Sequence, residues 1–379
     1  GNSSTALSGS RLQRSLPRLA MTDPFWRVAT PLLYSANHIY VYPEHRDYDA
    51  EDRFPTNWPY MIVSQGSSGS DQPFLRAVAM TLAAFPKDTF ETLRTEGLVA
   101  PTVQMILRRT LKTVKSRDDY LSGLAHPPVF NSENLRPGWM VAKASDMRPE
   151  DIPPLVRLKV LEEDFKAAAG LADLEERLLD SPSAISRLWR DFAYERSMIV
   201  SAEDTVKRTD RPFNFVWRVL QGDPDRFRIE PLDPFGMRAR IHISWHDPWT
   251  ETVPLRNSSF ERQVSRVDIG VFAQIGENDS APAFISIDFP EHQTRNYVET
   301  SAGMQLKSID YDALARDAYF DPLLYWSAPW IDTAGYNAAN SLLGWERKQS
   351  NGEERFVPLA DDLLPEEYRP EDTGVVVNR

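Results

Sequence analysis

A short loop rich in serine and glycine holds the residue types that most readily support chemistry in this sequence. The loop, VSQGSSGSDQPF at residues 63–74, follows an apolar run and precedes a stretch, 74–85, of helical character. Backbone N–H groups at a helix start, next to glycines without side chains, favour bound anions. One interpretation is therefore a ligand- or anion-binding loop formed by Gly66, Ser67, Ser68, Gly69 and Ser70.

The same loop offers nucleophiles for a hydrolase, which would need a base within hydrogen-bond reach of a serine. Neither GxxxxGK[ST] nor GxGxxG is present. Ser70 stands at the fifth place of a G-x-S-x-G elbow, where crowding demands glycine. The simplest interpretation is a strand-to-helix turn capped by Ser70 or Asp71. The catalytic candidates are Ser67, Ser68, Ser70 and Asp71, with His38, His45 or His126 as the base.

Metal and cofactor chemistry has little support in the sequence. The chain has no cysteine, which excludes disulfides, thiolate catalysis and cysteine-ligated metals. Of the six histidines, His242 and His246 are four residues apart in a strand-to-loop stretch, so they do not share a helix face. We predict neither a metal site nor a cofactor.

Charged residues gather in two acidic runs and one basic segment. The acidic runs at 44–52 and 162–164 are typical of solvated faces, although a glycosidase would also need two carboxylates across a groove. The basic segment either faces solvent or docks on an acidic protein or on anionic lipid headgroups at a membrane surface. Its residues are Arg108, Arg109, Lys112, Lys115 and Arg117, on a helix predicted over 102–115.

Aromatic residues are dense between 311 and 345. Trp and Tyr offer a large contact area with a polar tip, so they stack on sugars, anchor a protein interface or fasten a chain segment to a core. The proline-broken stretch YWSAPW is typical of a loop that meets a partner, whereas Trp345 lies in an amphipathic strand and should pack. The partner-binding candidates are Tyr325, Trp326 and Trp330, together with Arg108, Arg109 and Lys112.

The elements that must position these residues fall into two regions. Residues 20–192 read as mixed α/β, with strand-like spacing at 26–43, a buried strand at 60–64, a strand at 155–161 and a helix at 181–192. After them, six short runs show period-two alternation, which favours an antiparallel β-sandwich with Trp217 buried between its sheets. The runs are 196–204, 213–220, 226–232, 238–245, 265–275 and 281–289.

The second region also carries a resemblance to a known type of module. The order VSAED, RPFNFVWRVLQGD, ARIHISWHD and RVDIGVFAQIGENDSAPAFISI resembles the immunoglobulin-like modules of the polycystic-kidney-disease and cadherin type in exported bacterial proteins. Trp217 lies where such modules bury an aromatic residue. The earlier stretches YVYPEHRDYD, SQGSSGSDQPFLRA and AHPPVF resemble an uncharacterised family of large exported bacterial proteins. The resemblance implies secretion and supplies no activity.

Length and composition set the domain organisation. A chain of 379 residues is long for one core. The net charge is −12, so the protein lacks the overall positive charge that attracts nucleic acids. No apolar run is long enough to span a membrane. The sequence predicts an α+β multidomain protein. Its parts are an extended arm at 1–19, a mixed α/β region at 20–192, an immunoglobulin-like β-sandwich at 193–295 and an aromatic-rich C-terminal extension with a β-hairpin at 296–379.

Two functions follow from these patterns. The first is an extracytoplasmic binding or scaffold protein, an accessory subunit that docks on a larger assembly, through a protein partner or a polysaccharide. The second is a secreted hydrolase with its site near residues 64–71. The hydrolase needs a serine and a histidine to converge in the fold, whereas the scaffold needs an exposed docking surface.

Overall fold

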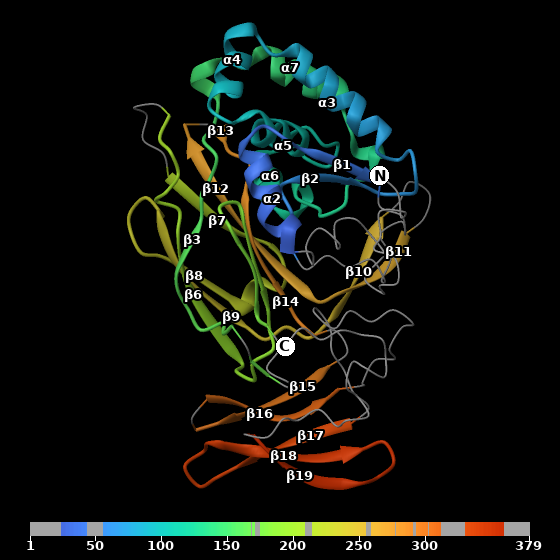
Figure 1. Ribbon diagram of the computed structural model, residues 1–379, viewed down its shortest axis with the longest axis vertical. Coiled ribbons are helices and arrows are strands. Elements are labelled where there is room, and N and C mark those ends of the chain that lie inside the picture. Colours follow the sequence, from blue (N-terminus) through green and yellow to red (C-terminus); the bar gives the residue numbers. More distant parts are fainter. Residues whose placement is uncertain are drawn as a thin grey trace.

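The computed structural model describes residues 24–43, 56–167, 169–170, 175–208, 214–254, 259–276, 278–290, 293–301, 303–311 and 330–359. Strands outnumber helices in these ranges, and most strand pairs are antiparallel. The α+β class is confirmed at this level. Figure 1 shows a helical layer at one end, facing sheets in the middle and a further sheet at the opposite end. The predicted arm at 1–19 lies outside the described residues.

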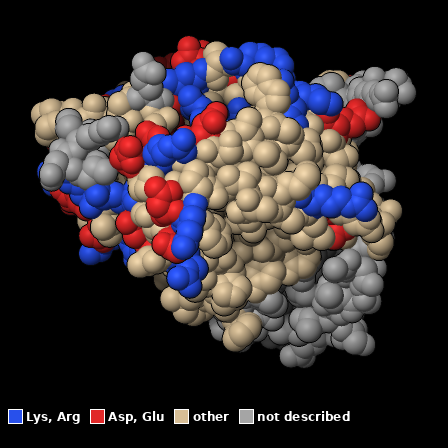
Figure 2. Space-filling model, turned by 90° about the horizontal axis from the view of Figure 1, so that it is seen from above, with Lys and Arg blue, Asp and Glu red and all other residues tan. Residues whose placement is uncertain are grey.

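The helical layer comes from the N-terminal part of the chain and encloses a parallel pair of strands, β1 (Tyr40–Pro43) and β2 (Met61–Ser64). Seen from above, this end presents a broad area of uncharged side chains (Figure 2). None of the helices in the described ranges is long and apolar enough to cross a membrane. The helices are α2 (Pro24–Ser35), α3 (Gln72–Ala84), α4 (Lys87–Thr95), α5 (Val99–Arg109), α6 (Arg117–Tyr120) and α7 (Pro137–Asp146). Short 3-10 turns cover Gly123–Ala125, Ser132–Asn134, Pro149–Asp151 and Pro224–Arg226.

Two sheets face each other in the middle of the molecule. The first is fully antiparallel, in the order β3 (Lys159–Glu163), β6 (Glu195–Ser201), β9 (Arg238–Ser244), β8 (Phe227–Pro231). The second has the order β4 (Arg177–Ser181), β5 (Ala184–Leu188), β14 (Ala283–Asp288), β12 (Arg266–Ile275), β7 (Asn214–Gln221), with β13 (Asn278–Asp279) also on β12. Within it, β5 and β14 run parallel.

A shared apolar core joins these two sheets. Ile241 and Ile243 of the first sheet pack in one cluster with Val267 and Ile269 of the second. Trp217 belongs to the same cluster and is only 7% exposed, which confirms its predicted burial. The six strands predicted between 195 and 290 are also confirmed, as β6, β7, β8, β9, β12 and β14.

The second sheet is buried on both faces. Phe272 of β12 packs into the core of the helical layer, and Leu179 and Ala184 of β4 and β5 join Tyr60 beside β2. The helical layer and the two sheets therefore form three stacked layers. Strands β3, β4 and β5 complete the two middle sheets, although the predicted boundary at 192/193 separates them from the strands with which they pair.

The C-terminal part forms a third, antiparallel sheet that docks beneath the middle sheets. The ring of Trp345 lies 4.7 Å from that of Phe192, and the Arg295 guanidinium lies over the Trp245 ring. The Asn351-Gly352 pair joins the last two strands, as its turn chemistry predicts. The strands are β15 (Thr294–Thr300), β16 (Gly303–Asp310), β17 (Trp330–Tyr336), β18 (Leu342–Gln349) and β19 (Glu354–Pro358). A separate ribbon pairs β10 (Trp249–Pro254) with β11 (Ser259–Val264).

Two predictions of secondary structure are wrong. Residues 24–35 form helix α2, so the strand-like spacing at 26–43 holds only for β1. The predicted helix at 181–192 is a tight hairpin followed by β5, because the Ser181 hydroxyl accepts the Ala184 N–H instead of capping a helix. Burial of β5 on both faces removes the alternation that would have revealed a strand.

A buried histidine makes the fold sensitive to acid. The His246 ring donates from Nδ1 to the Ser244 carbonyl and accepts the Asp223 N–H at Nε2, so both nitrogens are satisfied only in the neutral form. Burial lowers the pKa of His246 from 6.5 to about 4. The unfolded chain binds this proton near pH 6.5 and the folded chain near 4. Stability is therefore lost as the pH falls through this window, by ~3 kcal/mol.

We expect the free energy of unfolding, measured by urea unfolding, to fall between neutral pH and pH 4. The fall should be smaller for His246→Gln than for the wild type. The exposed His38 provides the matched control, His38→Gln, which should follow the wild type. Equal acid-induced losses in both variants would show that His246 does not cause the sensitivity.

Candidate functional site

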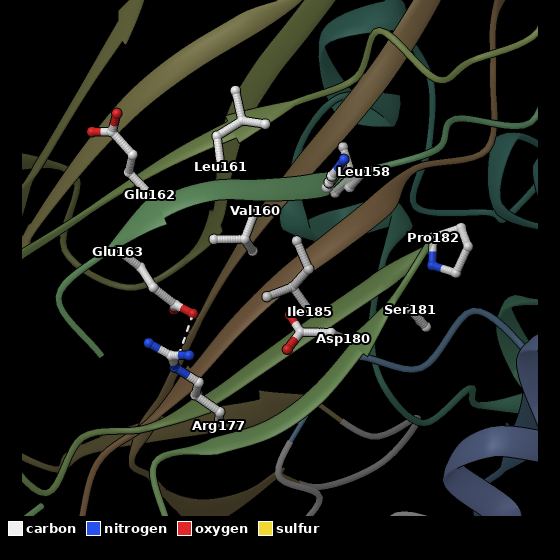
Figure 3. Close-up of a pocket in the computed structure, with 11 residues that line it drawn as sticks. Leu158, Val160, Leu161, Glu162, Glu163, Arg177, Asp180, Ser181, Pro182 and Ile185 are labelled. Atoms are coloured by element: carbon white, nitrogen blue, oxygen red, sulfur yellow. Dashed lines mark ion pairs between the residues drawn. The ribbon is translucent and has the colours of Figure 1, made fainter. Parts of the chain in front are cut away.

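A groove of about 710 Å³ runs between strands β3 and β4 (Figure 3). Among the described strands, β3 lies at an edge of the first sheet and β4 at an edge of the second, so each pairs with one neighbouring strand of its sheet. The groove is lined by residues 158–163 along β3, and by Arg177, residues 180–182 and Ile185 from β4 and β5. Its volume lies within the roughly 300–1,000 Å³ of ligand pockets.

Hydrogen bonds and ion pairs fix both ends of the groove. At one end, the Leu158 N–H donates to the Pro182 carbonyl at 2.7 Å. At the other, Arg187 Nε donates to Glu163 at 2.7 Å and its Nη2 to Asp180 at 2.7 Å, from a fully buried position. Figure 3 shows Glu163 pointing toward Arg177, which it meets at 3.1 Å. These bonds hold β3 and β4 at a fixed separation, so the groove is formed before any ligand binds.

The backbone of Val160 faces the open middle of the groove. Successive residues of a strand direct their N–H and C=O groups to opposite sides. The Leu158 N–H points away from β6, toward Pro182, so the N–H and C=O of Val160 point the same way. In the described part of the chain, no partner bonds them there. A half-buried donor and acceptor thus lie at an unfilled strand edge.

Side chains complete a short apolar floor. Figure 3 shows Val160 and Ile185 pointing toward each other, while Leu161 and Glu162 point away from β4. The register between β3 and β6 shifts between Val160 and Glu162, which makes Leu161 a bulge that is 44% exposed. The bulge ends regular pairing, so an added segment would pair with β3 over only a few residues.

Two of the three carboxylates that line the groove are bound as acceptors. Glu163 and Asp180 both accept N–H groups of Arg187, so they bridge β3 and β4. General acid catalysis would need one carboxyl group that carries a proton and faces a substrate. The arrangement supports a structural role for these two residues and a binding role for the groove.

The predicted serine–glycine site folds onto itself. The Ser70 hydroxyl donates to the Gly66 carbonyl at 3.1 Å, and the Ser70 and Gln72 N–H groups donate to Ser67 and Gly69. Gly66 and Gly69 adopt positive φ angles of 116° and 99°, which glycine tolerates without strain. Two of the donors that an anion would need are therefore used within the loop.

The helix after this loop is confirmed as α3, with Pro73 in its first turn. The predicted side-chain cap is wrong, because Asp71 precedes the helix without a capping hydrogen bond and Ser70 bonds inside the loop. Ser67 and Ser68 are exposed.

The candidate bases do not converge on these serines. His126 is buried, and its Nε2 lies 2.5 Å from the Tyr120 carbonyl oxygen. Burial lowers the pKa of His126 well below its usual value, and the charge of Arg108 adds to the effect. His38 is exposed and contacts the Ala36 carbonyl, while His45 lies outside the described residues. Among the described residues, no histidine bonds to a loop serine.

The basic segment does not form an exposed face. Helix α5 ends at Arg109, so Lys112 lies beyond it, exposed. Arg108 is only 1% exposed and lies between the rings of Phe130 and Phe284, at 4.9 and 5.4 Å. Arg109 pairs with the buried Asp279 at 3.3 Å. The prediction of a docking surface at Arg108 is wrong, because α5 is covered by the helical core and by the second sheet.

The aromatic candidates divide in the same way. Trp345 is buried, as predicted. Trp330 is only 2% exposed, and its ring lies 4.0 Å from the Arg347 guanidinium, so its predicted contact with a partner is wrong. Arg347 in turn forms a buried pair with Asp332 at 2.8 Å. Tyr325 and Trp326 lie outside the described residues.

Sequence reasoning also missed the role of the acidic run at 162–164. Glu163 binds Arg187, and Asp164 lies 3.1 Å from Arg196, so two of its three residues neutralise buried arginines. The available signal was the pair of arginines inside apolar strands, at 187 and 196, which demand carboxylate partners.

No family model matches the sequence, and no curated protein matches it. Within the described ranges, no group of three or more His, Cys, Asp or Glu side chains is arranged to hold a metal ion.

Proposed function

We propose that this chain is a non-enzymatic binding protein that holds an extended segment of a partner protein in the groove between β3 and β4. The observation that carries the proposal is the backbone of Val160, whose N–H and C=O face an open, preformed groove. A segment that adds beside β3 satisfies both groups, and alternate side chains reach Val160 and Ile185.

We also propose that the two middle sheets form an immunoglobulin-like sandwich of the polycystic-kidney-disease or cadherin type. The orders β3-β6-β9-β8 and β14-β12-β7 correspond to the two sheets of such sandwiches, and β5 extends the second sheet by pairing parallel to β14. This topology and the resemblance of residues 195–290 support the proposal. By the same resemblance, we place the chain outside the cytoplasm, periplasmic or secreted, as an accessory subunit of a larger assembly.

A binding role is better supported than hydrolysis at residues 64–71. The described histidines bond elsewhere, and Ser70 bonds within its own loop. The groove, in contrast, has the unfilled backbone groups that a docked strand requires.

The test uses peptides selected from a random display library on the full chain. We expect selected peptides to bind the groove, and Val160→Pro to weaken them at least tenfold, which is ~1.4 kcal/mol. Proline removes the N–H that faces the groove and spares the ladder to β6, so the strand itself should tolerate it.

The matched control lies on the opposite edge of the same sheet. Ile229 of β8 directs its N–H away from β9, since the neighbouring Leu232 N–H donates to the Arg238 carbonyl. Ile229→Pro should leave peptide affinity unchanged. Equal losses in both variants, or none at Val160→Pro with the fold intact, would contradict the proposed site.

A further inference from the structure

A second groove, of about 500 Å³, lies at the helical end of the molecule. One wall is helix α7, and the other is formed by α5 and the short strand β13. The residues that line it from α7 are Trp139, Ala142, Lys143 and Asp146, whose spacing of three and four places them on one helix face. This groove shares no residue with the groove between β3 and β4.

Trp139 is an exposed aromatic side chain among the residues that line this second groove. Its side chain is 59% exposed, whereas Trp189, Trp217, Trp245, Trp330 and Trp345 are all buried. The Arg136 guanidinium lies 3.4 Å from the centre of its ring, which is direct stacking on one face. The guanidinium thus covers one face of the indole, and the exposed Trp139 side chain also lines the groove.

The opposite wall is polar and rigid. Asp279 is buried, and it accepts two hydrogen bonds from Arg117, at 2.7 and 2.8 Å, and one from Arg109. Asn278 lies beside it and also lines the groove. This wall therefore combines guanidinium donors held by Asp279 with the Asn278 amide, which can both donate and accept hydrogen bonds.

Further charged groups of both signs line the floor and the α7 wall. Burial lowers the pKa of Lys143, and the nearby Arg109 charge adds to the effect. Asp146 and Asp151 supply carboxylates close by. The groove therefore has no single sign of charge to select an acidic or a basic ligand.

We propose that this groove binds a pyranose unit of a neutral polysaccharide, stacked on the indole of Trp139. A sugar ring has an apolar C–H face and a rim of hydroxyl groups that both donate and accept hydrogen bonds. The indole matches the face, and the mixed polar wall at Asn278, Lys143 and Asp146 matches the rim. A protein anchor would instead favour an apolar pocket around the aromatic ring.

Figure 2 shows a broad area of uncharged side chains at the helical end of the molecule. Together with the first groove, this site would let one chain hold a polysaccharide and a protein partner at separate places.

The probes are neutral hexasaccharides of glucose, xylose, mannose and N-acetylglucosamine, titrated into the full chain by calorimetry. We expect at least one to bind. Trp139→Ala should weaken it at least tenfold and Trp139→Phe less, because phenylalanine keeps part of the stacking face. Met80→Ala, an exposed apolar residue of α3 outside the groove, should leave the affinity unchanged.

Three outcomes would overturn the proposal. The first is that none of the hexasaccharides binds the wild type. The second is that Trp139→Ala does not change the affinity for the hexasaccharide that binds. The third is that Trp139 becomes buried only when a protein partner binds. Failure here is distinguishable from failure of the proposed function, because Trp139→Ala leaves the groove between β3 and β4 intact and peptide binding can be measured on the same variant.

Discussion

Replacing Glu176 with alanine is expected to lower the free energy of unfolding by about 3–5 kcal/mol. The Glu176 carboxylate is fully buried and accepts two hydrogen bonds from Arg196, at 2.6 and 3.0 Å. It also accepts the backbone N–H groups of Lys166, Arg190 and Asp191, each at 2.8 Å. Its removal leaves these donors without their acceptor and the buried guanidinium with only Asp164.

The measurement is urea unfolding of Glu176→Ala beside Glu175→Ala. Glu175 is the exposed neighbour, and its carbonyl bond to Arg190 survives the change. The control should differ from the wild type by about 0.5 kcal/mol or less. Similar small losses in both variants would mean that the carboxylate network contributes little.

The second large effect is expected for Trp189→Ala, which should lower the free energy of unfolding by about 3–5 kcal/mol. Its ring is fully buried and stacks on Phe289 at 5.1 Å. Trp245 and Phe165 meet it edge-on at 6.0 and 5.9 Å. These rings come from different strands and connections, so the cavity left by alanine would lie at the centre of the middle sheets.

Trp139→Ala is the matched control, since the same side chain is lost from an exposed position. Its effect on the free energy of unfolding should stay within about 0.5 kcal/mol. Equal destabilisation by the two substitutions would contradict the assignment of Trp189 to the core.

Period-two alternation identified the strands that have one face toward the shared core and one toward solvent. In β9, Ile241 and Ile243 are buried while Arg240 is exposed, and this contrast is visible in the sequence. In β5 every side chain is buried, so Ser181-Pro182 was the remaining local signal and it favoured a helix start. The strand pairs with β4 in a tight hairpin and with β14 about a hundred residues away, and local patterns do not encode the second pairing.

The candidate site was less accessible to sequence reasoning than the fold. Val160 and Ile185 belong to different sheets, and their opposition depends on where β3 and β4 end as edge strands. Arg108 was predicted to lie on a helix face that is open to solvent or to a partner, because a charged side chain is usually exposed, yet it packs between two phenylalanine rings and bonds to Gln104. The hydrophobic pattern of the sequence around Trp139 does not reveal that this tryptophan is exposed and not buried.

The central claim is that β3 offers an unfilled edge at Val160, and amide hydrogen exchange tests it most directly. In the free chain, the Val160 N–H should exchange faster than that of Lys159, which faces β6 in the ladder. With a selected peptide bound, the Val160 N–H should become protected while that of Ile229 stays unchanged. Protection of Val160 in the free chain, or peptide binding that leaves its exchange unaltered, would contradict the proposed function.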